Sequence, residues 1–175
     1  SYVWATRYDG KIMFSGTDAS TVINSVYNIL SANEKIILKG TFILTNPIFP
    51  ISEHELEIQG VLRIADKTES SLTSDALIGQ NTIYVTSASG FYSGQWVVIG
   101  DTNKELFHGK YKHGDGGIIQ SISDNTITLD RNMQYDHKIV DAASLGTCGA
   151  AIVLENVNNV WIHGGEIDGN RVNQI

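Results

Sequence analysis

Cysteine is nearly absent from this chain, whose only copy is Cys148. An internal disulfide is therefore excluded, as are the metal sites that are built from paired cysteines. We expect Cys148 to be a small buried side chain. Long hydrophobic runs are absent too, since none approaches the ~18 residues of a membrane-spanning helix. The sequence therefore predicts no membrane insertion.

Basic residues are also few. The chain has 12 Lys and Arg against 19 Asp and Glu, which gives a net charge of −7. Binding to a phosphate backbone requires clustered Lys and Arg, so we expect no nucleic-acid partner. No glycine-rich phosphate loop precedes a helix, and nucleotide binding is unsupported. A hydrophobic content of 42% with 17 glycines favours a globular β-rich chain over a disordered one.

What the chain does contain is a short pattern that occurs three times. It reads apolar, any residue, apolar, polar, Gly and then a second apolar run, and its copies begin at Ile36, Leu56 and Val160. Self-similarity at about 20 residues is typical of a solenoid whose coils stack their strands in register. The third copy carries Gly165 as an extra residue, which predicts a β-bulge there.

The long gap before the third copy predicts an inserted domain. We divide the chain into residues 1–66 (an N-terminal hairpin, a capping helix and the first coils), 67–147 (an inserted small β domain) and 148–175 (the resumed coil). Strand patterns inside the insertion cover residues 82–86, 95–99, 117–122 and 126–130. Antiparallel pairing of these four strands predicts a small barrel or a curled sheet.

The first 66 residues show three kinds of element. Asp9-Gly10 lies between two apolar segments and predicts a hairpin turn. Thr17 or Asp18 can cap a helix whose apolar side chains recur at helical spacing up to Leu30. The first coil is then predicted as three strands, 36–38, 41–44 and 48–51, with a corner at Lys39-Gly40. The coil resumes at residues 150–154.

These segments resemble the N-terminal portion of the right-handed parallel β-helix superfamily, the pectate-lyase-like or polygalacturonase-like group. The resemblance rests on residues 15–20 (SGTDAS), 35–42 (KIILKGTF) and 159–170 (NVWIHGGEIDGN). It implies a mainly β fold, a right-handed parallel β-helix of few coils with a small antiparallel β-barrel-like insertion. The insertion resembles those of some members, including virus tail proteins and microbial surface proteins. In the enzymes of this superfamily the catalytic carboxylates usually lie on later coils.

Glu166 and Asp168 are the candidate catalytic residues. They are two apart on a predicted strand and so face the same way, which suits acid–base work on a glycosidic bond or the binding of Ca²⁺. The alternative is that Asp168-Gly169-Asn170 forms a corner turn while Glu166 lies on a solvated face. No other cofactor is expected.

The candidate ligand-binding residues are Trp161, His163, Arg171 and Tyr111. Trp161 lies between two apolar residues that should face inward, so its ring should face outward. An exposed aromatic ring matches the apolar face of a sugar. Packing of Trp161 beneath the inserted domain is the alternative.

The polar, glycine-rich stretch at residues 101–116 supplies the candidate metal ligands His108, His113 and Asp115. Long loops on rigid scaffolds often bind ligands, and Tyr111 could contact a sugar from this one. The alternative reading of this stretch is an exposed hairpin tip without a ligand.

Two functions from different classes fit these features. The first is a non-catalytic extracellular β-helix module of a surface, adhesion, fibre or filament protein, placed outside the cell, on the cell surface or on a virion, that contacts glycans. The alternative is the N-terminal part of a polysaccharide lyase or glycoside hydrolase. We expect the first, and therefore no catalysis by these residues.

The open end of a solenoid also predicts self-assembly. If the chain ends at Ile175, its last coil exposes unpaired backbone groups and an open apolar core. A second copy stacked end to end would cover both. We therefore expect a homo-oligomer or an end-to-end polymer, with polysaccharide as a further partner.

Overall fold

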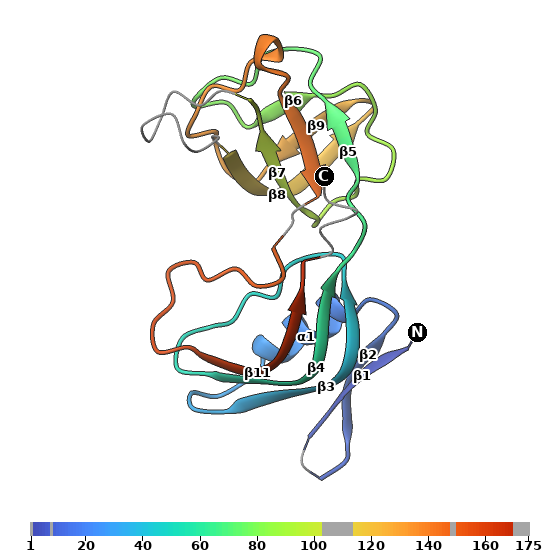
Figure 1. The fold of residues 1–175 in the computed structure, drawn as a ribbon, viewed down its shortest axis with the longest axis vertical. Coiled ribbons are helices and arrows are strands. Elements are labelled where there is room, and N and C mark those ends of the chain that lie inside the picture. The colour runs from blue at the N-terminus through green and yellow to red at the C-terminus, as the bar shows by residue number, and fades with distance from the viewer. Residues whose placement is uncertain (1, 8, 103–113, 148–149, 170–175) are drawn as a thin grey trace. The chain divides into compact units, whose positions relative to one another are not determined.

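The computed structural model describes residues 2–7, 9–102, 114–147 and 150–169 of the chain. The chain is mainly β, as predicted, and divides into two units, residues 1–66 with 149–175 and residues 67–148 (Figure 1). Among the described residues, no helix is long and apolar enough to cross a membrane.

The first unit begins with the predicted hairpin. Strands β1 (Val3–Thr6) and β2 (Ile12–Gly16) pair antiparallel around a turn in which Gly10 has a φ of 81°. Helix α1 (Ala19–Tyr27) follows, and the Asp18 carboxylate caps it by accepting from the Thr21 N–H at 2.9 Å. The predicted helix extended to Leu30, but the observed helix ends at Tyr27.

Replacing Asp18 with alanine is expected to destabilise the protein by about 1–2 kcal/mol at pH 7, because the helix loses its N-cap. The Thr45 hydroxyl, which donates to the same carboxylate at 2.7 Å, also loses its acceptor. Urea unfolding measures the difference. Asp18→Asn is the matched control because asparagine caps equally well. An Asp18→Ala variant as stable as the unsubstituted chain would contradict the capping role.

The contribution of this cap should depend on pH. Burial raises the pKa of Asp18, but hydrogen bonds from Thr21, Thr45 and Ser20 outweigh burial and hold the pKa below its ordinary value of 3.8. The stabilisation is therefore present above pH 3.8 and is lost as the pH falls through the lowered pKa. The difference in the free energy of unfolding between the unsubstituted chain and Asp18→Ala should therefore decrease as the pH falls through that range.

A three-stranded parallel sheet forms the centre of the first unit. Its order is β11-β4-β3, with β3 (Lys35–Leu44), β4 (Glu55–Ile64) and β11 (Trp161–Asp168). Strands β3 and β4 pair without interruption from Lys35↔Glu55 to Leu44↔Ile64. This confirms the predicted stacking of the first two copies of the repeat. Leu56 and Leu62 are fully buried between the sheet and α1, in a core completed by Ala19, Ile23, Tyr27, Ile36, Leu38, Leu44, Ile48, Ile58, Ile64 and Ala151.

Two of the predicted strand boundaries were wrong. No break occurs at Lys39-Gly40, because Gly40 adopts a φ of 113° and remains paired with Gly60, so the chain bends inside one continuous ladder. The predicted strand 48–51 is reduced to one parallel bridge, Ile48↔Ile152. The bridge lies where the coil was expected to resume.

The predicted register of the third copy was also wrong. Ile162, not Val160, pairs with Leu56, and the ladder shifts between Gly164 and Glu166. At the shift, two residues of β4 lie opposite the single residue Gly165 of β11. Strand β11 therefore has one residue fewer than β4 at this point, whereas the sequence predicted one residue more. Gly164 and Gly165 have φ angles of 78° and 53°, a backbone that only glycine adopts readily and that absorbs the difference.

The second unit contains one curled, mainly antiparallel sheet of order β5-β10-β7-β8-β9-β6. The four predicted strands are present as β6 (Thr82–Tyr84), β7 (Trp96–Gly100), β8 (Gly114–Ser123) and β9 (Thr126–Leu129). Two short strands that the sequence did not predict, β5 (Glu69–Ser71) and β10 (Ser144–Thr147), flank them, and a 3-10 turn, η1 (Ile139–Asp141), precedes β10. A bridge between Leu72 and Val85 joins the two edges of the sheet.

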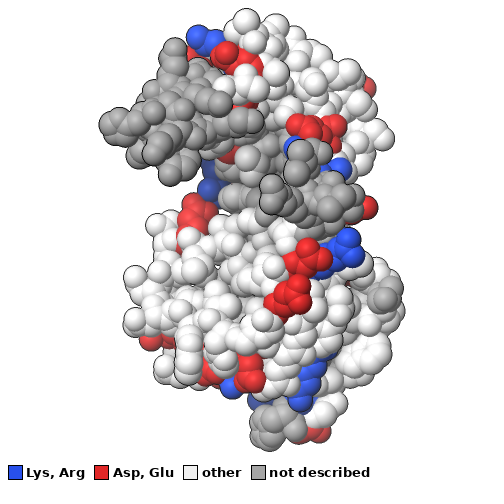
Figure 2. All heavy atoms as spheres, in the orientation of Figure 1, with Lys and Arg blue, Asp and Glu red and all other residues white. Residues whose placement is uncertain are grey.

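Antiparallel pairing predominates in the described part of the chain. Parallel pairing there is confined to the β11-β4-β3 sheet and the Ile48↔Ile152 bridge. On the face drawn in Figure 2, the Lys and Arg side chains of the described residues lie in small groups among Asp and Glu and form no extended basic surface.

Candidate functional site

Alternation along the parallel sheet gives it one apolar and one polar face. The apolar side chains of β3 and β4 are buried toward α1, while the residues between them point the other way. We call the exposed group at the start of the three strands the outer face. It consists of Lys35 and Ile37 on β3, Glu55 and Glu57 on β4, and Trp161 and His163 on β11.

The ladder places these side chains beside one another. Lys35 and Trp161 both pair with Glu55, one from each side. In the same way, His163 is the direct neighbour of Glu57. Lys35 and Glu55 therefore place opposite charges directly across adjacent strands, an arrangement that stabilises cross-strand pairs.

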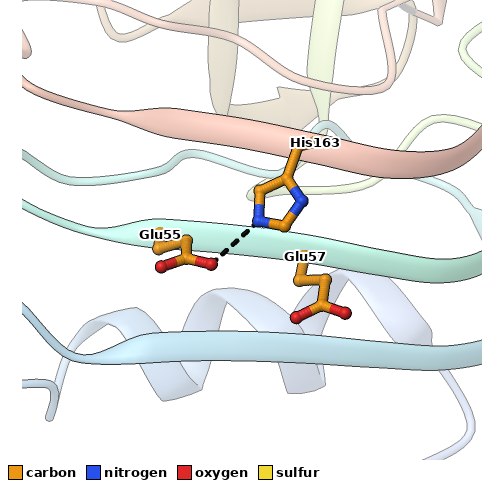
Figure 3. Close-up of side chains that lie close together, drawn as sticks. All are labelled: Glu55, Glu57 and His163. Carbon is orange, nitrogen blue, oxygen red and sulfur yellow. Dashed lines mark hydrogen bonds and ion pairs between the residues drawn. The ribbon is translucent and has the colours of Figure 1, made fainter.

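The Glu55 and Glu57 carboxylates converge on Lys35, and Glu55 has His163 as a second partner. The Lys35 ammonium lies 2.9 Å from Glu55 Oε1 and 2.5 Å from Glu57 Oε2. His163 Nε2 lies 2.8 Å from the same Glu55 oxygen, on the side of β11 (Figure 3). The Gln59 amide also donates to Glu57. These side chains are about one-fifth to one-third exposed, so the cluster is fixed in position and still open to solvent.

These contacts keep the cluster ionised at neutral pH. The hydrogen bond with His163, and then that with Lys35, lowers the pKa of Glu55 below its ordinary value of 4.5. The hydrogen bond from Gln59, and then that from Lys35, lowers the pKa of Glu57. The bonds to Glu57 and Glu55 raise the pKa of Lys35. The site therefore presents two carboxylates and one ammonium in fixed positions.

Trp161 adds an aromatic surface to this charged cluster. Its side chain is 63% exposed, which confirms that the ring faces outward. The ring centroid lies 4.7 Å from that of His163, at an interplanar angle of 33°. The imidazole thus contacts the indole on one side and the Glu55 carboxylate on the other.

The predicted catalytic pair lies farther along β11, beyond the register shift. Glu166 pairs with Val61 and is exposed, while Asp168 pairs with Arg63. The Asp168 carboxylate lies 3.5 Å from Arg63 Nε in an ion pair. One member of the pair is thus engaged with a cation. The catalytic role of the two residues stays a prediction.

Four of the predicted site residues, His108, Tyr111, His113 and Arg171, lie outside the described residues. Asp115 lies inside them and is buried. Its carboxylate accepts from the backbone N–H groups of Gln134 and Tyr135 at 3.0 Å, and lies 3.0 Å from His137 Nε2. Asp115 therefore has structural partners, and the metal role suggested for it stays a prediction.

Sequence reasoning missed Lys35, Glu55 and Glu57 as site residues. A usable signal existed, because the repeat places Lys35 directly beside Glu55 on the next coil. The contact between His163 and Glu55 had no such signal, since it requires the register that the structure revealed. The outer face is thus a product of stacking and not of a contiguous motif.

Comparisons with known proteins give structural neighbours only. No protein-family model matches the chain, and no match was found among curated proteins. The gp54 tailspike of Acinetobacter baumannii bacteriophage AP22, solved in complex with A. baumannii capsular saccharide, is 20% identical, with a TM-score of 0.47 over 83% of this chain. The Pseudomonas phage phi297 tailspike gp61 is 11% identical, with a TM-score of 0.47 over 85% of this chain. This chain spans only 26% and 28% of those two proteins.

Proposed function

We propose that this chain is a non-catalytic module of a surface or virion protein that contacts glycans through the outer face. The observation that carries the proposal is the exposed Trp161 ring beside fixed charged groups. An indole presents a flat apolar surface that matches the apolar face of a pyranose ring. Carboxylates accept hydrogen bonds from sugar hydroxyls, and an ammonium donates to them.

Rigidity supports the same proposal. Lys35, Glu55, Glu57 and His163 are held by hydrogen bonds and ion pairs on strands whose backbones are themselves paired. A ligand that binds such a surface loses little free energy to ordering of the side chains. The site lies on regular strands and not on a loop, which favours a constant binding geometry.

The architecture we propose is a right-handed parallel β-helix of few coils. Strands β3, β4 and β11, which contain the three copies of the repeat, lie side by side in one parallel sheet, and the Ile48↔Ile152 bridge supplies a second parallel contact. Both contacts are expected of stacked coils. The curled sheet of residues 67–148 is the proposed barrel-like insertion. Strand β11 is an edge of its sheet, so a further coil or a second copy could pair with it, which keeps self-assembly a prediction.

The alternative function is the N-terminal part of a polysaccharide lyase or glycoside hydrolase. It requires two carboxylates placed on either side of a glycosidic bond. Asp168 is instead paired with Arg63, and the outer-face carboxylates are both paired with Lys35. The non-catalytic proposal is therefore preferred.

Replacing Trp161 with alanine is expected to weaken glycan binding about tenfold, the equivalent of ~1.4 kcal/mol, because the stacking surface is lost. Affinity electrophoresis against a panel of neutral and acidic soluble polysaccharides measures the change. Trp4→Ala is the matched control, since Trp4 is 58% exposed but lies on β1. Polysaccharide binding that is unchanged in Trp161→Ala would contradict the proposed site.

A further inference from the structure

We infer that Glu55, Glu57 and His163 also form a binding site for a divalent transition-metal ion, and that the Lys35 ammonium competes with the metal for it. One ligand atom from each of the three residues lies within 4.8 Å of the other two. Figure 3 shows the three side chains on the same face of the sheet, two from β4 and one from β11. This inference depends only on that geometry and not on the proposed glycan contact.

The donor set suits zinc and its neighbours in the transition series. Imidazole nitrogen and carboxylate oxygen bind Zn²⁺ at about 2.0–2.2 Å, which places tetrahedral ligands about 3.4 Å apart. The three ligand atoms lie within 4.8 Å of one another, so they would have to approach by at most about 1.4 Å to reach that spacing. The strands themselves do not have to move, since Glu57 and His163 are already direct neighbours in the ladder. Water would complete the coordination of the ion.

Lys35 shows that the two carboxylates already converge on one positive charge. Its Nζ lies within 2.9 Å of an oxygen of each glutamate. A divalent ion bound there would carry more charge than the ammonium and would gain the imidazole nitrogen as a third ligand. It would have to displace Lys35, whose ammonium would exchange its two ion pairs for contact with solvent. The Lys35 ammonium therefore competes with the metal ion for the same two carboxylates.

The imidazole distinguishes this cluster from a simple group of surface acids. His163 Nε2 faces Glu55, so the nitrogen that would bind the metal already points at a second ligand. Binding requires that this nitrogen give up its proton, which leaves Nδ1 as the protonated one. Trp161 packs against the same ring and limits its rotation, so the ligand is oriented before the metal arrives.

Isothermal titration of the full 175-residue chain with Zn²⁺ and with Ni²⁺ tests the inference. We expect one site whose affinity rises about tenfold in Lys35→Met and falls about tenfold or more in His163→Gln. Lys39→Met is the matched control, because Lys39 lies on the same strand but pairs with Gln59, and it should leave the affinity unchanged. Glu57→Gln provides a second loss-of-ligand variant, and far-UV circular dichroism checks that every variant folds.

Two results would overturn the inference. The first is an equal affinity in the unsubstituted chain, Lys35→Met and His163→Gln. The second is metal binding that survives His163→Gln and is abolished in a His108→Gln, His113→Gln double variant, which would assign the metal to residues 103–113. Quenching of tryptophan fluorescence by Ni²⁺ that is lost in both Trp161→Phe and His163→Gln would support the inference by a readout that needs no glycan. Failure of this site and failure of the glycan site are thus measured separately.

Discussion

Replacing His137 with alanine is expected to destabilise the second unit by about 2–6 kcal/mol, because two buried carboxyl groups each lose a hydrogen-bond partner at a cost of about 1–3 kcal/mol. His137 is completely buried. Its Nδ1 lies 2.7 Å from an Asp101 oxygen and its Nε2 lies 3.0 Å from an Asp115 oxygen. The ring thus bridges two buried carboxyl groups, and its removal takes a hydrogen-bond partner from each of them.

The measurement is urea unfolding followed by circular dichroism, with His163→Ala as the matched control. His163 also bonds to a carboxylate, but its side chain is one-third exposed. An exposed pair contributes at most about 1 kcal/mol. A triple variant in which Asp101 and Asp115 also become asparagine should recover part of the loss, since the carboxyl groups that lost their partner are then replaced. Equal losses of stability in His137→Ala and His163→Ala would show that the buried contacts of His137 stabilise the protein no more than an exposed pair does.

Replacing Gly60 with alanine is expected to destabilise the first unit by at least about 3 kcal/mol, the upper range for overpacking. A Cβ atom at this position would lie 1.9 Å from the carbonyl oxygen of Gly40 and 2.7 Å from its carbonyl carbon. Both are backbone atoms in the middle of a paired strand, so neither can move aside cheaply. Strands β3 and β4 would have to separate where they bend.

Alanine substitutions at Gly40 and Gly169 provide smaller expected losses of stability for comparison. A Cβ at Gly40 meets no atom within 4 Å, and its cost comes only from the φ of 113°, about 1–2 kcal/mol. A Cβ at Gly169 meets nothing, and Gly169→Ala should be close to neutral. Thermal unfolding of the three alanine variants should therefore rank Gly60 first, Gly40 second and Gly169 last. If Gly60→Ala unfolds at the temperature of Gly169→Ala, the close approach of β3 and β4 does not exist.

The pairing of the first two copies of the repeat could be predicted because the two copies are close in sequence and match residue for residue. Gly40 and Gly60 occupy the same place in the repeat and pair with each other. They are nonetheless glycine for different reasons, one for its backbone angle and one for the lack of space, which no pattern of letters distinguishes. The third copy was misaligned because consecutive positive φ angles at Gly164 and Gly165 shorten the strand.

The site was predictable only where it depends on alternation. Trp161 was assigned to the outside by the period of two along a strand, and the structure agrees. The buried histidine of the second unit had no such signal. Its partners lie 36 and 22 residues away in sequence, on strands and turns whose pairing is set by the whole sheet. Contacts of this kind follow from tertiary packing and not from spacing.

The pairing of β5 with β10 bears on how quickly the chain can fold. These strands begin and end the segment 67–148, and the Thr147 N–H donates to the Thr68 carbonyl at 2.8 Å. Once that segment has folded, the chain entering it and the chain leaving it are held together. The loop that β11 must close to reach β4 then shrinks from the whole segment to two short connections. Closure entropy grows with loop length, and distant contacts slow folding. Strand β11 thus has only a short loop to close before it pairs with β4, and this pairing should be fast although the two strands are far apart in the sequence.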